Sequence, residues 1–446
     1  MFWSQWYSLK SYARSALWIV PFFALLLHIV LIRLVYVIDT AIGWEPPWPW
    51  GITGTQMVLQ AIIAMTLTFL VFTFGSLLVA IQIAGGQLTP RIIAATLLRD
   101  NVIRLVVGLF ILTLLFATGA LARTDGRVYH LVSQIAGILG FCSVAAFLYL
   151  IDYAARLLRP VSIVWRIGET GRAVIESVYP EPAKETTATL ANAAFLPASR
   201  TILHRGKSGI VLAVNLKALV AEASSANGII EFLPRVGDFV GVGEPLFHLY
   251  GTAGSIDEQR VRSAVAFGPE RTMEQDSLFA FRILVDIAIK ALSKAINDPT
   301  TAVLALDQLQ RLLRVAGRRN LHDDVVPDAT GQLRVMFRTP NWADFVHLSF
   351  SEVRLYGAEN PQIARRLRAM IENLMQTLPP YRHEALAAEL SLLDRTLTRL
   401  YALPEDLALA RVPDPQGLGA ASVAPAEPPT APPDAGNDAE KSLMRA

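Results

Sequence analysis

Residues 55–83 read TQMVLQAIIAMTLTFLVFTFGSLLVAIQI, a run without a single Asp, Glu, Lys or Arg. The uncharged stretch is longer still, because no such residue occurs between Pro46 and Pro90. A helix needs about 20 mostly apolar residues to cross about 30 Å of hydrocarbon. This segment is therefore predicted to span a membrane, with length left for a tilt, a kink near Gly75 or an extension into the cytosol. Gly85-Gly86 is predicted to break the helix.

Three other segments are also long and apolar enough to cross a bilayer. The four predicted spans are about Ser15–Ile38, Thr55–Ile83, Leu105–Ala122 and Leu131–Ile151. Charged residues make up 17% of the 446 residues, against roughly 25% in soluble domains, and the deficit lies in the spans. We therefore predict an α-helical polytopic membrane domain of four transmembrane helices over residues 1–155. The first span is expected to be retained, because its apolar run exceeds the roughly 7–15 residues of a signal-peptide core.

Basic residues are concentrated in alternate loops between these spans. They occur in the amino-terminal arm, after the second span and after the fourth span, at Lys10, Arg14, Arg91, Arg99, Arg104, Arg156, Arg159, Arg166 and Arg172. The loop after the first span holds Asp39 and Glu45 and no basic residue. Because Lys and Arg gather on the cytoplasmic side of a membrane, both termini are predicted to be cytoplasmic.

Beyond the spans the pattern changes to that of a cytosolic α+β domain. We predict a juxtamembrane helix and linker over residues 156–198, a small β-rich module over 199–255, a helical subdomain over 256–410 and a disordered tail over 411–446. Short β-branched or aromatic runs punctuated by glycine indicate strands at Gly209–Val214, Gly228–Pro234, Phe239–Val240 and Pro245–Tyr250, with another at Leu333–Arg338. Apolar periodicity and Asp-Pro or Asn-Pro starts indicate helices at Ser277–Lys294, Pro299–Val315, Trp342–Leu355, Pro361–Thr377 and Tyr381–Tyr401.

The segment from Gly237 to Phe247 is similar to the hairpin of biotinyl- and lipoyl-type barrel-sandwich modules. It contains Gly237-Asp238-Phe239-Val240 followed by Gly243-Glu244-Pro245-Leu246-Phe247. Such carriers hold their cofactor on a lysine at a tight turn, yet no lysine occurs between Lys217 and Lys290. We therefore predict a barrel-sandwich-like module with a structural or docking role and no bound cofactor.

Two polar features occur in the predicted helical subdomain. Arg282, Asp286 and Lys290 are spaced four residues apart, so they share one face of a helix that is otherwise mostly apolar. An internal ion-pair network is the favoured interpretation, and a ligand or ion site is the alternative. Asn297 and Asp298 precede Pro299, which favours a helix cap first and a binding loop second.

The second span carries hydroxyl and small side chains on one face, at Thr66, Thr73, Ser76 and Ala80, with Gln82 and Gln87 near its cytosolic end. Small-residue faces usually pack against other helices, and they also line pores in oligomers. Packing is favoured over pore lining.

Catalytic and metal-binding patterns are missing from the sequence. No pair among the seven histidines has the i, i+4 spacing of a helical metal site, and there is no phosphate-binding loop, nucleophile elbow or Cys-x-x-Cys. We therefore predict no catalytic, cofactor or metal site and no enzymatic activity. The net charge of +2, with a cytosolic part that is slightly acidic, argues against a nucleic-acid partner.

Three stretches taken in order resemble one bacterial family. They are Ser76-Leu-Leu-Val-Ala-Ile-Gln82-Ile-Ala-Gly-Gly-Gln87-Leu-Thr-Pro90-Arg91, the hairpin from Gly237 to Phe247, and Asp286-Ile-Ala-Ile-Lys290-Ala-Leu-Ser-Lys-Ala-Ile-Asn297-Asp298-Pro299-Thr-Thr-Ala302. Together they are similar to the predicted membrane proteins of the domain-of-unknown-function 2254 family. The resemblance implies a bacterial inner-membrane protein with an amino-terminal membrane domain and a cytosolic carboxyl-terminal domain. It implies no reaction, and it singles out Gln82, Gln87, Pro90, Arg91, Asp286, Lys290, Asn297, Asp298 and Pro299.

Two functional hypotheses follow. The favoured one is a non-enzymatic, homo-oligomeric channel or transport-type protein with a cytosolic regulatory domain, in which Thr66, Thr73 and Ser76 line a path between subunits. The alternative is a membrane-anchored ligand sensor or scaffold that binds a partner through its cytosolic domain. The sequence identifies no specific ion or small ligand.

Overall fold

The computed structural model describes most of the chain. The described ranges are residues 18–43, 51–87, 100–124, 127–157, 159–183, 197–321 and 325–420, together with Trp3, Trp6, Tyr7, Leu9, Ala13 and Ala16 of the amino-terminal arm. The predicted tail from residue 421 onward, most of the predicted linker, and Pro90 and Arg91 lie outside these ranges.

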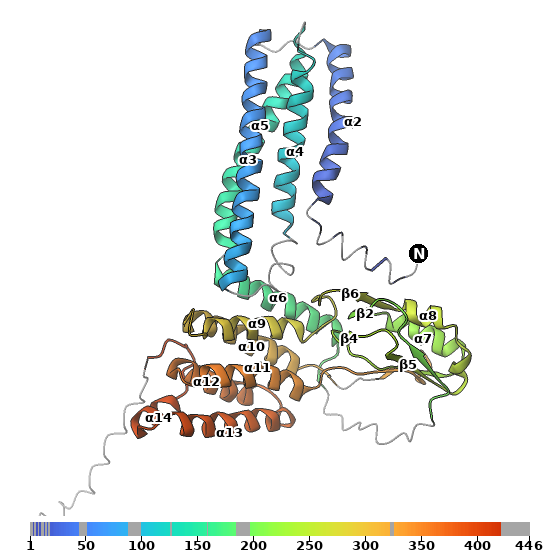
Figure 1. The fold of residues 1–446 in the computed structure, drawn as a ribbon, viewed down its shortest axis with the longest axis vertical. Helices are drawn as coiled ribbons and strands as arrows, with labels where there is room; N and C mark the ends of the chain where they lie inside the picture. Colours follow the sequence, from blue (N-terminus) through green and yellow to red (C-terminus); the bar gives the residue numbers. More distant parts are fainter. Residues whose placement is uncertain are drawn as a thin grey trace, which may run out of the picture.

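Four long apolar helices form an elongated bundle at the amino-terminal end (Figure 1). They are α2 (Ile19–Ile42), α3 (Ile52–Gln87), α4 (Asn101–Leu121) and α5 (His130–Leu157). All four are long and apolar enough to cross a membrane, so the prediction of four spans is confirmed. Helix α4 lies between α2, α3 and α5 and is half buried, whereas most of α2 faces outward, as expected for side chains in contact with lipid.

Helix α3 is continuous from Ile52 to Gln87. The prediction that Gly85-Gly86 breaks this helix is therefore wrong, because both glycines are helical. At about 1.5 Å per residue, its 36 residues extend well beyond the thickness of the hydrocarbon. The end of α3 consequently reaches the part of the molecule that follows the bundle, as Figure 1 shows.

A buried carboxylate caps a helix at each end of the bundle. Asp39, near the end of α2, accepts hydrogen bonds from the backbone N–H groups of Leu131 and Val132 at 3.1 and 3.3 Å. Asp100 accepts from Val102 N at 2.9 Å and from Ile103 N at 3.4 Å. The first N–H groups of a helix have no partner within the helix, so these bonds satisfy groups that are otherwise costly to bury.

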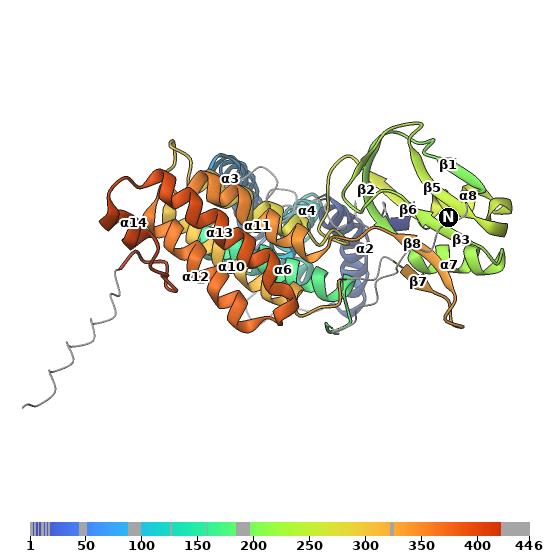
Figure 2. The same cartoon turned by 90° about the horizontal axis from the view of Figure 1, so that it is seen from below.

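The part of the chain after the bundle forms two lobes beneath it, seen from below in Figure 2. We call the helix-rich one the helical lobe. It contains α9 (Phe279–Ala291), α10 (Pro299–Gly317), α11 (Trp342–Gly357), α12 (Pro361–Thr377), α13 (His383–Leu400) and α14 (Pro404–Ala410). Helix α9 is nearly all apolar and packs against α10 and α11 in one continuous core.

The second lobe, here called the β lobe, contains two small sheets. Its strands are β1 (Arg200–Leu203), β2 (Gly209–Val214), β3 (Ile229–Phe232), β4 (Phe239–Val240), β5 (Pro245–Tyr250), β6 (Val265–Gly268), β7 (Val325–Pro327) and β8 (Leu333–Phe337), joined by helices α7 (Leu216–Ser225) and α8 (Glu258–Ser263). The strand orders are β1-β5-β3-β8-β7 and β4-β2-β6. Strands β6, β7 and β8 come from the range predicted to form the helical subdomain. The β lobe is thus larger than residues 199–255.

Helix α6 (Pro160–Val178) follows α5 directly and packs against α9 and α10 of the helical lobe. The amino-terminal arm returns to the same end of the bundle, where Trp3 and Tyr7 pack against Ile210, Leu212 and Ala266 of the β lobe. Both ends of the bundle sequence therefore lead to the two lobes, as expected for an even number of membrane helices.

Candidate functional site

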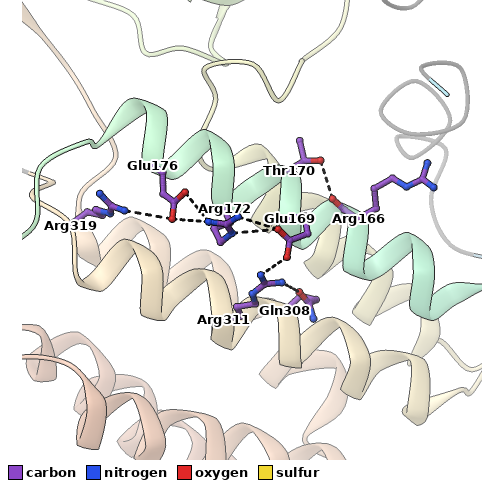
Figure 3. Close-up of polar contacts among 8 residues, drawn as sticks. All are labelled: Arg166, Glu169, Thr170, Arg172, Glu176, Gln308, Arg311 and Arg319. Carbon is purple, nitrogen blue, oxygen red and sulfur yellow. Dashed lines mark hydrogen bonds and ion pairs between the residues drawn. The ribbon is translucent and has the colours of Figure 1, made fainter. Parts of the chain in front are cut away.

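Helix α6 is attached to the helical lobe by a row of charged contacts (Figure 3). Glu169 forms an ion pair with Arg311 of α10, and Arg172 bridges Glu169 and Glu176 on α6 itself. Glu176 also lies 3.5 Å from Arg319, at the end of α10. The hydrogen bond from Arg311 holds the pKa of Glu169 below its ordinary value. These contacts are partly exposed, so they contribute more to the orientation of α6 than to stability.

Two glycines bring α6 close to the helical lobe. A Cβ atom at Gly168 would lie 2.2 Å from Gln308 Oε1 of α10, and one at Gly171 would lie 2.6 Å from the Cβ atom of Ala280 on α9. The Ala280 Cβ atom cannot move away, because it is bonded directly to the backbone of a buried helix. Only glycine at position 171 therefore permits this helix spacing.

The same helix is also attached to the membrane bundle. Arg166 donates a hydrogen bond to Asp100 Oδ2 at 3.2 Å, and the Tyr153 hydroxyl donates to the same oxygen. Asp100 is buried and caps α4, while Tyr153 lies on α5. One carboxylate thus joins α4, α5 and α6 at the end of the bundle nearest the lobes.

The other end of α6 reaches a cavity of about 620 Å³ between the two lobes. Tyr179, directly after the helix, lines this cavity, and its hydroxyl oxygen lies 3.5 Å from both Ser277 Oγ and the Pro340 carbonyl oxygen. The opposite wall includes Phe232 and Val236 of the β lobe. The size falls within the roughly 300–1,000 Å³ of small-molecule sites, which also occur preferentially between domains.

Trp3 of the amino-terminal arm completes one side of this interlobe cavity. Its ring stacks at a tilt against Tyr7, with the ring centroids 5.2 Å apart. The arm leads into α2, and α6 continues from α5. The first and the last membrane helix are therefore each connected to the wall of the same cavity.

Asp276 lies at the base of the cavity and was not singled out from the sequence. It is 5% exposed, and its Oδ1 atom accepts hydrogen bonds from Leu278 N and Phe279 N, both at 3.1 Å, at the start of α9. Its Oδ2 atom lies 3.8 Å from the Arg271 guanidinium and beneath Gly237, where a Cβ atom would come within 2.4 Å. Burial raises the pKa of Asp276 to about 6. The signal that could have found it is an Asp two residues before an apolar helical run.

Gly237 meets Asp276 in a left-handed conformation, with φ of +95°. Arg271 Nε donates to the Gly237 carbonyl at 2.9 Å. The Gly-Asp turn of the predicted hairpin therefore contacts the segment that starts α9. Glycine is required here both by the backbone conformation and by the lack of space.

The charged face of α9 divides into two contacts. Arg282 donates to Asp286 Oδ1 at 2.7 Å and also pairs with Glu352 of α11. Lys290 instead donates to the carbonyl oxygen of Gly85 at 2.8 Å. That carbonyl lies near the end of the described part of α3. Lys290 thus joins the helical lobe to the second candidate membrane helix.

The loop after α9 is held by its own backbone. Asn297 has φ of +48°, and its N–H donates to Ser293 O at 2.8 Å, while Asp298 N donates to Ala291 O at 2.8 Å. Asp298 Oδ1 accepts from Thr301 N at 3.0 Å, and Pro299 is the first residue of α10. Asp298 therefore acts as the helix cap that the sequence favoured over a binding loop.

The polar residues of α3 lie in different environments. Thr66 and Thr73 are 0% and 4% exposed on the stripe of α3 that packs against α4 and α5. Ser76 is exposed and donates to the Thr73 carbonyl, and Gln82 is exposed near the end of the helix. Gln87 is the last helical residue, whereas Pro90 and Arg91 lie outside the described residues.

The described residues contain no candidate metal site. Within the described ranges, no three His, Cys, Asp or Glu side chains gather closely enough to hold an ion. The polar chemistry that the described residues do bring together consists of helix caps, ion pairs and the lining of the interlobe cavity.

The predicted hairpin from Gly237 to Phe247 does not form, because β4 pairs with β2, whereas β5 pairs with β1 and β3 in the other sheet.

Comparison with known proteins identifies the family of this chain. Residues 14–373 match a family described as predicted membrane protein (DUF2254). The chain belongs to this family. Three relatives, from Mycobacterium bovis and from two strains of Mycobacterium tuberculosis, are each 26% identical over 423 residues, which is 90% of this chain and 80% of the relative. Each is called an uncharacterized protein. No solved structure matches the chain.

Proposed function

We propose that this member of the DUF2254 family is a non-enzymatic, membrane-anchored sensor. A small ligand binds in the interlobe cavity, and its binding changes the position of α6 and of the amino-terminal arm relative to the bundle. The observation that carries the proposal is the connection of this cavity to the membrane: Tyr179 follows α6, and Trp3 leads into α2.

The contacts of α6 support this transmission. The helix is anchored at one end to Asp100 in the bundle and along its length to Arg311 and Arg319 of α10. A ligand that moves the two lobes apart or together changes the positions of Tyr179 and Ser277 in the cavity wall. Because α6 packs without a gap at Gly171, movement of the helical lobe is passed to α6 and from there to α5.

A channel or transport role has less support. The face that carries Thr66 and Thr73 is covered by α4 and α5 of the same chain, so it is not available to line a path between subunits. Most of the exposed residues of α3 are apolar, among them Phe72, Leu78 and Val79, as expected against lipid, although Ser76 and Gln82 are exposed as well. Homo-oligomerisation stays a prediction from the sequence.

The sensor is proposed to lie in the bacterial inner membrane with both termini in the cytoplasm. The positions of Lys and Arg support this orientation. Reporter fusions test it: a fusion at Gly126 should report the outside and one after Arg411 the inside. The reverse pattern would contradict the orientation.

The sensor proposal can be tested without knowing the ligand. Val326 lines the cavity and is half buried, so Val326→Trp fills part of the space that a ligand would occupy. We expect faster hydrogen–deuterium exchange in α6 and at the end of α3, measured on the full-length protein in nanodiscs. Leu203→Trp is the matched control, because Leu203 is exposed on β1 and does not line the cavity. Unchanged exchange in both regions of Val326→Trp would refute the coupling.

A further inference from the structure

The charge distribution around the interlobe cavity is uneven. Lys217 and Arg338 line it and are exposed at its rim. Neither forms an ion pair with a carboxylate among the residues that the structure describes. Two cationic side chains that line one cavity, neither paired with a described carboxylate, favour a ligand that supplies an anion.

The two carboxylates at the cavity are already engaged. Asp276 is buried, caps α9 and faces Arg271. Glu181 takes part in another interaction within the chain. Among the described residues, neither carboxylate is paired with Lys217 or Arg338, so both cations remain for a ligand.

Most of the remaining wall is apolar, although polar side chains such as Asn215 and Gln275 also line it. The apolar and aromatic residues include Trp3, Tyr179, Phe232, Val236, Val326 and Phe337. Such a surface gains free energy by removing apolar ligand atoms from water, roughly 25 cal/mol for each Å² buried. Aromatic rings also offer flat faces for a planar ligand.

We propose that the ligand of the cavity is an amphipathic anion, with an apolar or aromatic body between the lobes and one carboxylate-like group at Lys217 and Arg338. This inference rests on the proposed sensor function and names its ligand class. The apolar body supplies most of the binding energy, and the two cations select the sign of the charge. A cationic ligand with the same body is disfavoured by both side chains.

Two probes of one shape test the sign of the charge. Naphthalene-2-carboxylate and the corresponding naphthylmethylammonium ion are titrated calorimetrically into the full-length protein in zwitterionic nanodiscs, with empty nanodiscs subtracted. We expect the carboxylate to bind about tenfold more tightly than the ammonium ion. The double variant Lys217→Gln/Arg338→Gln should weaken carboxylate binding by about tenfold, whereas Lys207→Gln, an exposed lysine outside the cavity, should leave it unchanged.

A charge-reversed variant and a cavity-filling variant complete the test. Lys217→Glu/Arg338→Glu should prefer the ammonium probe, and Val326→Trp should weaken both probes. Preference of the wild type for the ammonium ion, or no binding of either probe, would overturn the ligand class. Carboxylate binding that Val326→Trp does not weaken lies outside the cavity and would also overturn it. The sensor proposal is judged separately by hydrogen exchange in Val326→Trp, which uses no probe.

Discussion

The membrane bundle meets the helical lobe at two places that are built very differently. At α6 the contact is broad: glycine allows close packing on α9, charged pairs reach α10, and Asp100 joins the same helix to α4 and α5. At α3 the contact described is a hydrogen bond from Lys290 to the Gly85 carbonyl. The first we call the α6 joint and the second the α3 joint.

The difference indicates how the two joints behave under strain. Close packing in the α6 joint loses many contacts at once if it is disturbed, so this joint moves as a unit with the helical lobe. The hydrogen bond described at the α3 joint is worth only about 1 kcal/mol, so within the described residues this joint can open and close at low cost. The α6 joint is therefore suited to transmit a movement and the α3 joint to respond to one.

The largest effect is expected from disturbing the close packing of the α6 joint. Gly171→Leu forces a side chain against Ala280 and Leu312 and should destabilise the folded protein by about 3 kcal/mol or more. Thermal unfolding of the purified protein measures this loss. Gly137→Leu is the matched control, because no atom lies within 4 Å of an added Cβ there. Equal stability of the two variants would mean that α6 is not closely packed.

The start of α9, the helix that both joints share, should make stability depend on pH. The folded-state pKa of Asp276, about 6, lies above the ordinary 3.8. The folded protein therefore binds the extra proton, and stability falls as pH rises from about 4 to 6, by roughly 2–3 kcal/mol in total. Asp276→Asn keeps an oxygen for the two backbone bonds and should remove this fall.

Unfolding midpoints between pH 4 and pH 8 for the wild type and Asp276→Asn give the comparison. The difference between the two proteins should grow with pH up to about 6 and then stay constant. A difference that is the same at every pH would show that the Asp276 carboxyl does not titrate in this range.

An intermediate loss of stability is expected from changing Asp100, on the bundle side of the α6 joint. Asp100→Ala removes a helix cap and the acceptor for Tyr153 and Arg166, at a cost of about 2 kcal/mol. Asp100→Asn retains an oxygen for the cap but loses the ion pair, so it should fall between the alanine variant and the wild type. Thermal unfolding of the wild type, Asp100→Asn and Asp100→Ala measures the three stabilities. If Asp100→Asn loses as much stability as Asp100→Ala, the whole effect belongs to the ion pair.

The smallest effect on stability is expected at the α3 joint. Lys290→Met removes the bond to Gly85 and should cost about 1 kcal/mol or less, while hydrogen exchange at the end of α3 should rise. Lys294→Met, an exposed lysine one turn further along, is the control. No change in exchange at residues 84–87 would mean that Lys290 does not hold α3.

Features that depend on nearby residues were predictable from the sequence. The four spans follow from apolar composition alone, and α12 begins at Pro361 and ends at Thr377 as predicted, because Asn360-Pro361 is a strong start signal. Strands β2, β4 and β5 were also predicted with their observed bounds. Asp298 was expected to be a cap and is one.

Features that depend on distant residues were not predictable in the same way. Strand β8 pairs in parallel with β3, more than 100 residues earlier, so the predicted boundary at residue 255 does not follow the sheets. The helix through Gly85-Gly86 was expected to end, but the propensity cost of glycine is only about 1 kcal/mol, and Lys290 binds the last turn. Nothing local in the sequence places Trp3 at the wall of a cavity.

The sequence by itself determined that this chain crosses a membrane four times and where its helices begin, because both depend on apolar composition and on bonds between residues a few positions apart. Only the tertiary structure decided that Arg282 pairs with Glu352 as well as with Asp286 while Lys290 reaches α3, and that Asp276, Tyr179 and Trp3 meet at one cavity. Those contacts depend on the packing of helices and sheets far apart in the chain, and each helix face offers several partners until packing selects one.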